Sequence, residues 1–263
     1  MRLPRSLLWF GGAFVLLLVV VAAGLHRPAD RIVATALWQD VPCWGRTLGE
    51  RASVVFAAEL SLLYALAMGF VCLWRRRPIA GGWIVFLLLA GVGIEIVLKY
   101  NFTHPSPSAF FETVTRAPCG VPGVGYPLTV VPTPSSLPSG YSIRATYFCL
   151  LLAAMLSGRW PWLRWVAWPV LVTVAAVAAA SRVTVGWHWP SDVAAGVLLG
   201  TCAAVLATAQ AGNFGWLRAR ARARAGARAG GRSGPAGRYG RGAGASGRSR
   251  GSGNRPPTQR PRR

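Results

Sequence analysis

The sequence predicts an all-α protein, a bundle of six transmembrane helices with a disordered, Arg/Gly-rich C-terminal tail. Three observations support this fold class. Hydrophobic residues make up 53% of the 263 residues, which is more than a soluble domain usually carries. Long apolar runs alternate with short polar segments, as in proteins that cross a membrane several times. The C-terminal stretch alternates arginine with alanine and glycine and contains no acidic residue.

Six apolar segments approach the roughly 20 residues that a helix needs to cross the hydrocarbon core. The first follows two arginines as a signal peptide would, but its apolar stretch is long for a signal peptide, so we expect a retained helix. The fourth and fifth are short or rich in alanine. The six segments together define an expected membrane domain over residues 1–212. In chain order the segments cover residues 6–25, 53–74, 79–98, 143–156, 166–180 and 193–210.

The tail, residues 213–263, carries much of the formal charge of +22. It has little apolar surface to bury, so we expect it to be disordered. A solvated cytoplasmic tail that sets the topology is one interpretation, and binding to anionic lipid head groups is another. Tyr239 is almost the only aromatic residue among the arginines, so no specific nucleic-acid partner is expected. Nothing in the sequence identifies a protein partner.

Arginine clusters predict the orientation in a plasma membrane. These clusters fall on one side of a six-helix chain, and the positive-inside rule places that side, with both termini, in the cytoplasm. The segments 26–52, 99–141 and 181–192 then face outward. The first outer segment also carries arginines, which Asp30, Asp40 and Glu50 offset. The clusters are Arg2 with Arg5, the run 75–77, Arg159 with Arg164, and the tail.

Two of the five cysteines, Cys43 and Cys119, fall in outer segments, where oxidising surroundings permit a disulfide without requiring one. The other three fall in expected helices, as packing residues do. The histidines, His26, His104 and His188, are far apart in the sequence, and no CxxC occurs. We therefore expect neither a metal site nor another cofactor.

Three polar segments converge on the predicted outer surface. They surround Lys99, the stretch "LPSGYS" at 137–142 and the stretch "SRVTVGWHWPSD" at 181–192. Singly, each has an ordinary explanation: a lysine at a helix end anchors the helix and pairs with Glu95 one turn earlier, and a histidine between tryptophans belongs to an interfacial belt. Because charges at a membrane edge are costly, their convergence indicates a functional site.

The residue types at this surface suit an anion. Lys99 and Arg182 supply fixed positive charges, and a guanidinium matches phosphate oxygens. Ser139 and Gly140 precede a helix, whose first N–H groups attract negative charge.

The same surface also carries a candidate nucleophile. His188 lies four residues before Asp192. If a helix begins near Trp189-Pro190, the carboxylate turns back onto one ring nitrogen of His188 and leaves the other free to attack.

These residues resemble the type-2 phosphatidic acid phosphatase superfamily, six-helix membrane enzymes that share their core with vanadium haloperoxidases. The family's signatures are Lys-x6-Arg-Pro, Pro-Ser-Gly-His and Ser-Arg-x5-His-x3-Asp. The third is complete here, from Ser181 and Arg182 to His188 and Asp192. The motif resemblance covers residues 99–192 and excludes the tail.

The resemblance implies a metal-free phosphatase whose partner is a lipid phosphate substrate. His188 would attack phosphorus and form a phosphohistidine that water hydrolyses, with Asp192 orienting the ring. The phosphate oxygens would be held by Lys99, Ser139, Gly140 and Arg182.

Two positions depart from the pattern. Ser106 replaces the arginine of the first signature. Tyr141, which we count among the candidate phosphate-binding residues, replaces the histidine that protonates the leaving oxygen. Tyrosine, with a pKa of about 10, is a poorer acid than imidazole at neutral pH. A diphosphate leaving group needs an acid less, which favours a polyprenyl diphosphate. His104 is a candidate acid and Arg144 a candidate phosphate cation, although their ordinary explanations are a loop histidine before Pro105 and an interfacial cation.

Three functions therefore remain open. The first is a lipid phosphatase at the outer membrane face. The second is a catalytically weak or inactive relative that binds lipid phosphate or a partner protein, which the two departures favour. The third is a transporter, for which the sequence offers no internal repeat and, near mid-span, only Glu59 and Glu95 as charges.

Overall fold

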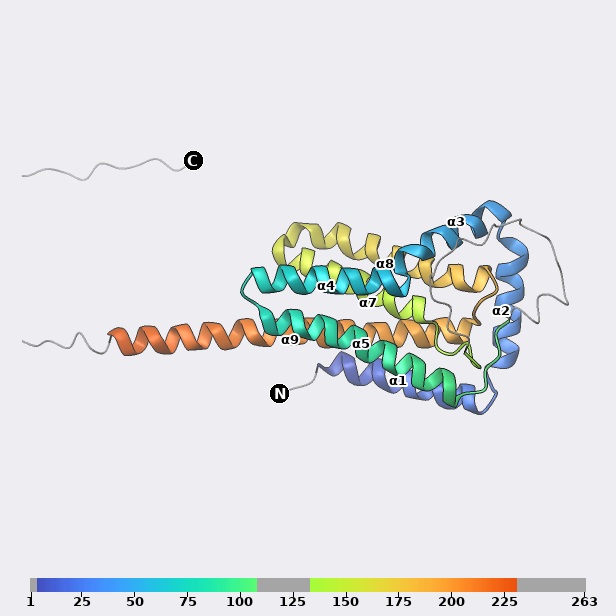
Figure 1. Ribbon diagram of the computed structural model, residues 1–263, viewed down its shortest axis with the longest axis horizontal. Helices are drawn as coiled ribbons and strands as arrows, with labels where there is room; N and C mark the ends of the chain where they lie inside the picture. The colour runs from blue at the N-terminus through green and yellow to red at the C-terminus, as the bar shows by residue number, and fades with distance from the viewer. Residues whose placement is uncertain (1–3, 108–132, 231–263) are drawn as a thin grey trace, which may run out of the picture. The chain divides into compact units, whose positions relative to one another are not determined.

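The computed structural model describes residues 4–107 and 133–230, and all regular structure in these ranges is helical (Figure 1). The prediction of an all-α fold is confirmed. The long helices are α1 (Arg5–Ala22), α4 (Ala58–Trp74), α5 (Pro78–Asn101), α7 (Gly140–Arg159), α8 (Arg164–Thr184) and α9 (Pro190–Gly230). The shorter ones are α2 (Arg27–Asp40), α3 (Cys43–Ser53) and the 3₁₀ turns η1 (Val54–Phe56) and η2 (Pro161–Leu163).

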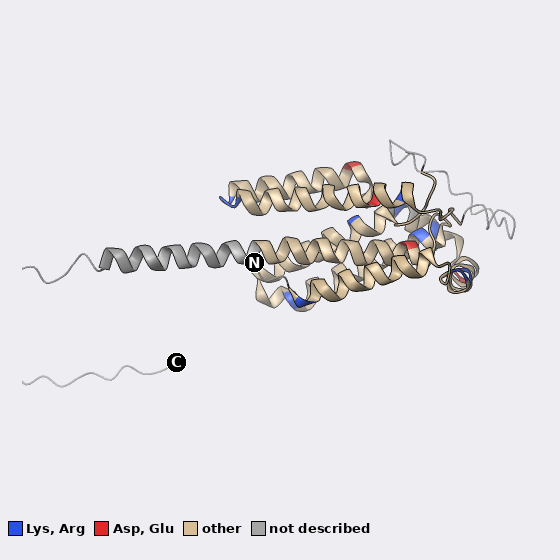
Figure 2. Cartoon of the chain, turned by 90° about the horizontal axis from the view of Figure 1, so that it is seen from below, with Lys and Arg blue, Asp and Glu red and all other residues tan. Residues whose placement is uncertain are grey.

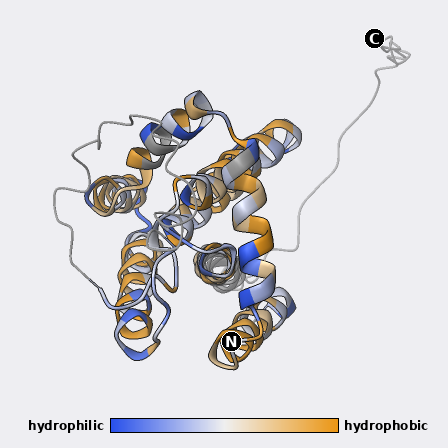
Figure 3. Ribbon diagram, turned by 90° about the vertical axis from the view of Figure 1, so that its right-hand side faces the viewer, coloured by the Kyte–Doolittle hydropathy of each residue, from blue (hydrophilic) through white to orange (hydrophobic). Residues whose placement is uncertain are grey.

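Among the described residues, five helices are long and apolar enough to cross a membrane. A sixth span follows if α4 is taken together with the segment Cys43–Phe56, to which it is joined at a bend of 45°. Acidic and basic residues gather near the helix ends and leave the middles uncharged (Figure 2). Hydrophobic residues make up much of the helices (Figure 3), and many of the large ones are exposed, as lipid contact requires.

The first outer segment differs from the loop that we expected between residues 26 and 52. It forms α2 and α3. Pro28 in the first turn of α2 fits a helix start, and Asp30 there complements the positive helix end. In Figure 1, α2 crosses the end of the bundle where α5 ends and α9 begins. This crossing brings N-terminal residues to the site described below.

The last helix also runs farther than expected. α9 continues to Gly230, past residue 212, where we had placed the start of a disordered tail. Alanine and arginine both have high helix propensity, so the alternating "RARARARA" stretch is compatible with a longer helix. Residues 231–263 lie outside the described part of the chain, and their disorder stays a prediction.

Helix α7 forms much of the described core and packs closely against α9. Its Tyr147 is almost fully buried and donates a hydrogen bond to the carbonyl of Ile84 in α5, at 2.8 Å. A Cβ on Gly196 would lie 2.6 Å from the Ser139 carbonyl oxygen, and one on Gly200 would lie 2.5 Å from that of Ile143. The G-x-x-x-G spacing of these two glycines thus lets α9 approach the α7 backbone.

We expect Gly200→Ala to destabilise the protein by about 1–3 kcal/mol, because the added methyl group must push apart two packed backbones. Gly93→Ala in α5 is the matched control, since a Cβ there meets nothing within 4 Å. Thermal unfolding in detergent measures both variants. Equal melting temperatures for the two would contradict the proposed close approach of α7 and α9.

Candidate active site

The stretch from Ser181 to Asp192 folds as a helix end, a reversal and a helix start. Helix α8 ends at Thr184, and Gly186 adopts a left-handed φ of 81°. The amide of Gly186 donates to the carbonyl of Val183 at 2.9 Å, and the amide of Trp187 donates to that of Arg182 at 3.1 Å. These two bonds form a Schellman motif, which requires a residue that tolerates positive φ. The reversal turns the chain back over the last turn of α8.

Helix α9 then begins with its own cap. Pro190 is the first helical residue, and the carboxylate of Asp192 accepts a hydrogen bond from the Trp189 amide at 2.9 Å. This is the carboxylate half of a capping box. The same oxygen, Oδ2, lies 3.5 Å from Nδ1 of His188. The local sequence thus places the carboxylate against the imidazole, as the four-residue spacing predicted.

His188 is a buried histidine in a positive environment. Its amide donates to the Arg182 carbonyl at 3.2 Å, and its side chain is 9% exposed. Burial lowers the pKa of His188; contact with Asp192 raises it, and the charges of Arg182 and Lys99 lower it further, with a net decrease. The ring is therefore neutral at physiological pH, which is the form that a nucleophile requires.

The start of α7 lies beside the start of α9. Ser139 is the N-cap residue of α7 and is fully buried. Its amide donates to the backbone carbonyl of Asp192 at 3.0 Å, and its hydroxyl accepts a hydrogen bond from Ser142 at 3.0 Å. Ser139 and Gly140 are therefore held next to the helix turn that carries Asp192.

The cradle expected for an anion contains a carboxylate of the protein. Glu95 contacts Lys99 at 2.8 Å and Arg144 at 3.3 Å, and a Cβ on Gly140 would collide with it. The expected pairing of Glu95 with Lys99 is confirmed. Arg144 also donates to the Phe56 carbonyl at 2.9 Å. The carboxylate thus lies close to the start of α7, where the helix dipole favours negative charge.

The ring of Tyr141 lies near the guanidinium groups of two arginines. Its centroid is 4.0 Å from Cζ of Arg182 and 5.1 Å from Cζ of Arg144. Arg182 also lies over the ring of Trp187, at 4.9 Å. These cation–π contacts hold Arg182 among aromatic faces at the edge of the site.

His104 contacts the second oxygen of Asp192, with Nδ1 at 3.1 Å from Oδ1. Its Nε2 lies 2.7 Å from Nε2 of His26. The two histidines are far apart in the sequence and meet in space because α2 returns to the end of the bundle. Both nitrogens of His104 already contact protein groups, which favours a role in positioning Asp192 over proton donation to a leaving group.

The structure brings most of the candidate residues to one end of the bundle. Ser106 is exposed. Cys43 is disulfide-bonded, as predicted for it. Its expected partner, Cys119, lies outside the described residues, so the pairing of these two cysteines stays a prediction. Sequence reasoning missed His26 and Asp30, because nothing in their local pattern shows that α2 crosses the bundle end. The residues at that end are Lys99, His104, Ser139, Gly140, Tyr141, Arg144, Arg182, His188 and Asp192.

The model of the PAP2 superfamily matches residues 80–216, and the chain belongs to this family of membrane proteins. A sequence relative is an undecaprenyl-diphosphatase of Sulfolobus acidocaldarius, 38% identical over 129 residues, which are 49% of this chain and 54% of the relative. The chain thus matches about half the length of that relative.

A solved structure shares the fold. It is the crystal structure of the first transmembrane PAP2-type phosphatidylglycerolphosphate phosphatase from Bacillus subtilis, with a TM-score of 0.63 and 21% identity. The match covers 81% of this chain and 98% of that one. At this identity the likeness concerns the fold alone.

We expect the pKa of His188 in detergent to lie below the ordinary value of 6.5. Asp192→Asn should lower it further, because the carboxylate is the contact that raises it. NMR titration of labelled histidine measures both, with His188→Ala assigning the signal. A pKa of 6.5 or higher in the wild type would contradict the buried, positive environment described here.

Proposed function

We propose that the chain is an integral membrane phosphatase that hydrolyses a lipid phosphate, preferentially a polyprenyl diphosphate, through a phosphohistidine. The observation that carries this proposal is the buried, neutral His188 held against Asp192, next to the positive charges of Arg182 and Lys99. Membership of the PAP2 superfamily and the similarity to an undecaprenyl-diphosphatase support it.

The reaction proceeds in two displacements. Nδ1 of His188 faces Asp192, so Nε2 attacks the terminal phosphorus, and the bond to the bridging oxygen breaks. The lipid monophosphate leaves with the electron pair of that bond. Water then attacks the phosphohistidine, the P–N bond breaks, and inorganic phosphate and neutral His188 are regenerated. Asp192 stabilises the positive ring in the transition state.

The preference for a diphosphate follows from the missing acid. Tyr141 occupies the position of the family's histidine, and both nitrogens of His104 contact other groups. A phosphate leaving group is weakly basic and departs without a proton, whereas the alkoxide of a monoester needs one. The site therefore suits a substrate whose leaving group is itself a phosphate.

The proposed setting is the plasma membrane, with both termini in the cytoplasm and the site at the outer face. The arginine clusters support this orientation. We propose that residues 1–212 form the membrane domain, and that the basic segment from residue 213 onward lies in the cytoplasm near anionic lipid head groups.

One observation favours a second candidate function, a lipid-phosphate binder with little turnover. The carboxylate of Glu95 occupies the cradle between Lys99 and Arg144, where a phosphate would otherwise receive both charges. Lys99 and Arg144, already neutralised by this carboxylate, bind an anion less readily than they would without it. The two departures from the family signatures also favour a protein with little turnover.

Phosphate release from polyprenyl diphosphate and from phosphatidate, by the purified full chain in detergent, tests the proposal. We expect turnover of the diphosphate by the wild type and by Gly93→Ala, and only background release by His188→Ala. Labelled substrate should leave an acid-labile phosphoenzyme in the first two proteins. Full activity of His188→Ala would exclude the mechanism, and tight vanadate binding without turnover would select the second candidate.

Restoring the family's histidine should broaden the substrate range. We expect Tyr141→His to raise kcat for a monoester relative to the diphosphate by about 10²-fold or more, the lower end of a general acid's contribution. Tyr141→Phe keeps an aromatic ring beside Arg182 and should retain the wild-type ratio. An unchanged ratio in Tyr141→His would argue against the missing acid as the origin of the preference.

A further inference from the structure

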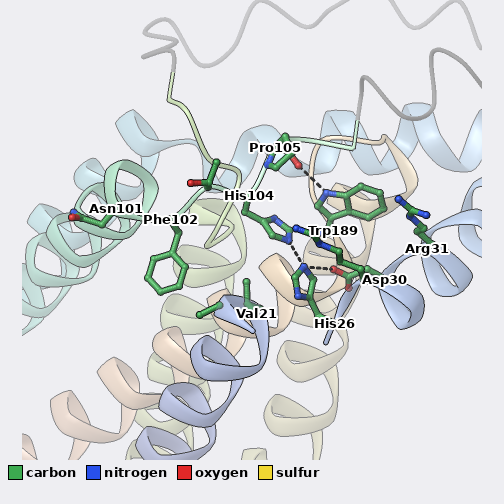
Figure 4. A pocket seen from close by; sticks show the side chains of 12 residues that line it. Val21, His26, Asp30, Arg31, Asn101, Phe102, His104, Pro105 and Trp189 are labelled. Carbon is green, nitrogen blue, oxygen red and sulfur yellow. Dashed lines mark hydrogen bonds and ion pairs between the residues drawn. The ribbon is translucent and has the colours of Figure 1, made fainter. Parts of the chain in front are cut away.

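Three buried side chains of metal-ligand type form a cluster beside the candidate active site. They are His26 and Asp30, at the start of α2, and His104, which follows α5, and we call them the His26 cluster (Figure 4). The cluster is joined to the active site through Asp192, whose Oδ1 contacts His104 and whose Oδ2 faces His188.

The spacing of the cluster fits a single ion. The two Nε2 atoms are 2.7 Å apart, Nε2 of His26 is 4.0 Å from Oδ2 of Asp30, and one ligand atom from each residue lies within 4.8 Å of the others. Ligand atoms of a tetrahedral zinc site are about 3.3 Å apart, given bonds of about 2.0–2.1 Å. The observed distances bracket this value, so small side-chain adjustments would complete the geometry.

Hydrogen bonding explains only part of this arrangement. Two imidazole nitrogens at 2.7 Å need a shared proton, because their lone pairs would otherwise repel. At 4.0 Å, Oδ2 of Asp30 is too distant to accept a hydrogen bond from His26, and the buried carboxylate accepts its hydrogen bonds from Ser191 instead. A cation between the three groups would ligate both Nε2 atoms and a carboxylate oxygen, and would compensate the charge of the buried carboxylate.

Two of the three candidate ligands are also held in place by contacts with residues outside the cluster. His104 turns Nδ1 toward the Asp192 carboxylate, at 3.1 Å. Asp30 accepts hydrogen bonds from the Ser191 amide at 2.9 Å and from its hydroxyl at 2.6 Å. A carboxylate behind a ligating histidine, and hydrogen bonds to a ligating carboxylate, are the usual outer shell of a metal site.

The cluster borders a cavity of about 650 Å³, which would leave coordination positions open. His26, Asp30 and His104 all line it, together with Trp189. Arg27 and Arg31 line the same cavity and would repel a bare cation, but they favour a water-derived or other anionic ligand on the ion. An ion with an open position, facing a cavity, is the arrangement of reactive rather than purely structural sites.

We propose that His26, Asp30 and His104 bind a divalent transition-metal ion of the zinc class. Two imidazoles and one carboxylate select such an ion over magnesium or calcium, which prefer ligand sets of oxygen alone. Since His104 contacts Asp192, the bound ion fixes the carboxylate that orients His188. Metal binding itself does not depend on the proposed phosphatase reaction.

Equilibrium dialysis of the full chain in detergent, after removal of metal with a chelator, tests the site with Zn²⁺ and with Co²⁺. We expect about one equivalent bound by the wild type, visible ligand-field bands with Co²⁺, and a higher Tm with either ion. His26→Ala should lose all three. Asp192→Asn, which removes the outer-shell partner of His104, should weaken affinity by about 10–100-fold.

His188→Ala is the matched control, because it removes a buried histidine from the same end of the bundle but no ligand. It should bind metal like the wild type even though it releases no phosphate, which separates this test from that of the proposed function. Asp30→Asn, which preserves side-chain size, should also lose binding if His26→Ala proves unstable. Absence of bound metal in the wild type, or unchanged binding in folded His26→Ala or Asp30→Asn, would overturn the proposal.

Discussion

The carboxylate of Asp192 is the constraint on which the rest of the site depends. It is fully buried, and its oxygens contact the Trp189 amide, His188 and His104 at 2.9, 3.5 and 3.1 Å. A buried carboxylate is costly without such partners, so the fold must keep them together. Its backbone carbonyl also receives the Ser139 amide, which ties the start of α7 to the same turn.

A second carboxylate, that of Glu95, organises the other half of the site. It joins Lys99 on its own helix to Arg144 on α7, close to Gly140. The positive groups are thereby ordered before any ligand arrives. Ordered charges need little reorganisation when negative charge develops, which is the main source of electrostatic catalysis. An incoming phosphate must displace this carboxylate from Lys99 and Arg144 or share the two cations with it. The carboxylate that orders the cradle therefore also lowers its affinity for an anion.

Sequence reasoning reached the parts of this architecture that local patterns determine. The spans follow from apolar length, and the contact of His188 with Asp192 follows from a reversal at Gly186 and a cap at Pro190, all within twelve residues. The path of α2 could not be predicted in this way. An amphipathic segment between two spans gives no sign of the direction in which it crosses the bundle, and that direction alone decides whether His26 reaches His104.

The tyrosine at position 141 fits its positively charged surroundings. Its ring lies near the guanidinium groups of both Arg182 and Arg144. An aromatic ring at this place suits the neighbouring cations, because the negative face of the ring attracts positive charge. In the proposed reaction, the leaving group is a phosphate, which needs stabilising positive charge more than it needs a proton. Two arginines beside a tyrosine supply that charge without a proton donor.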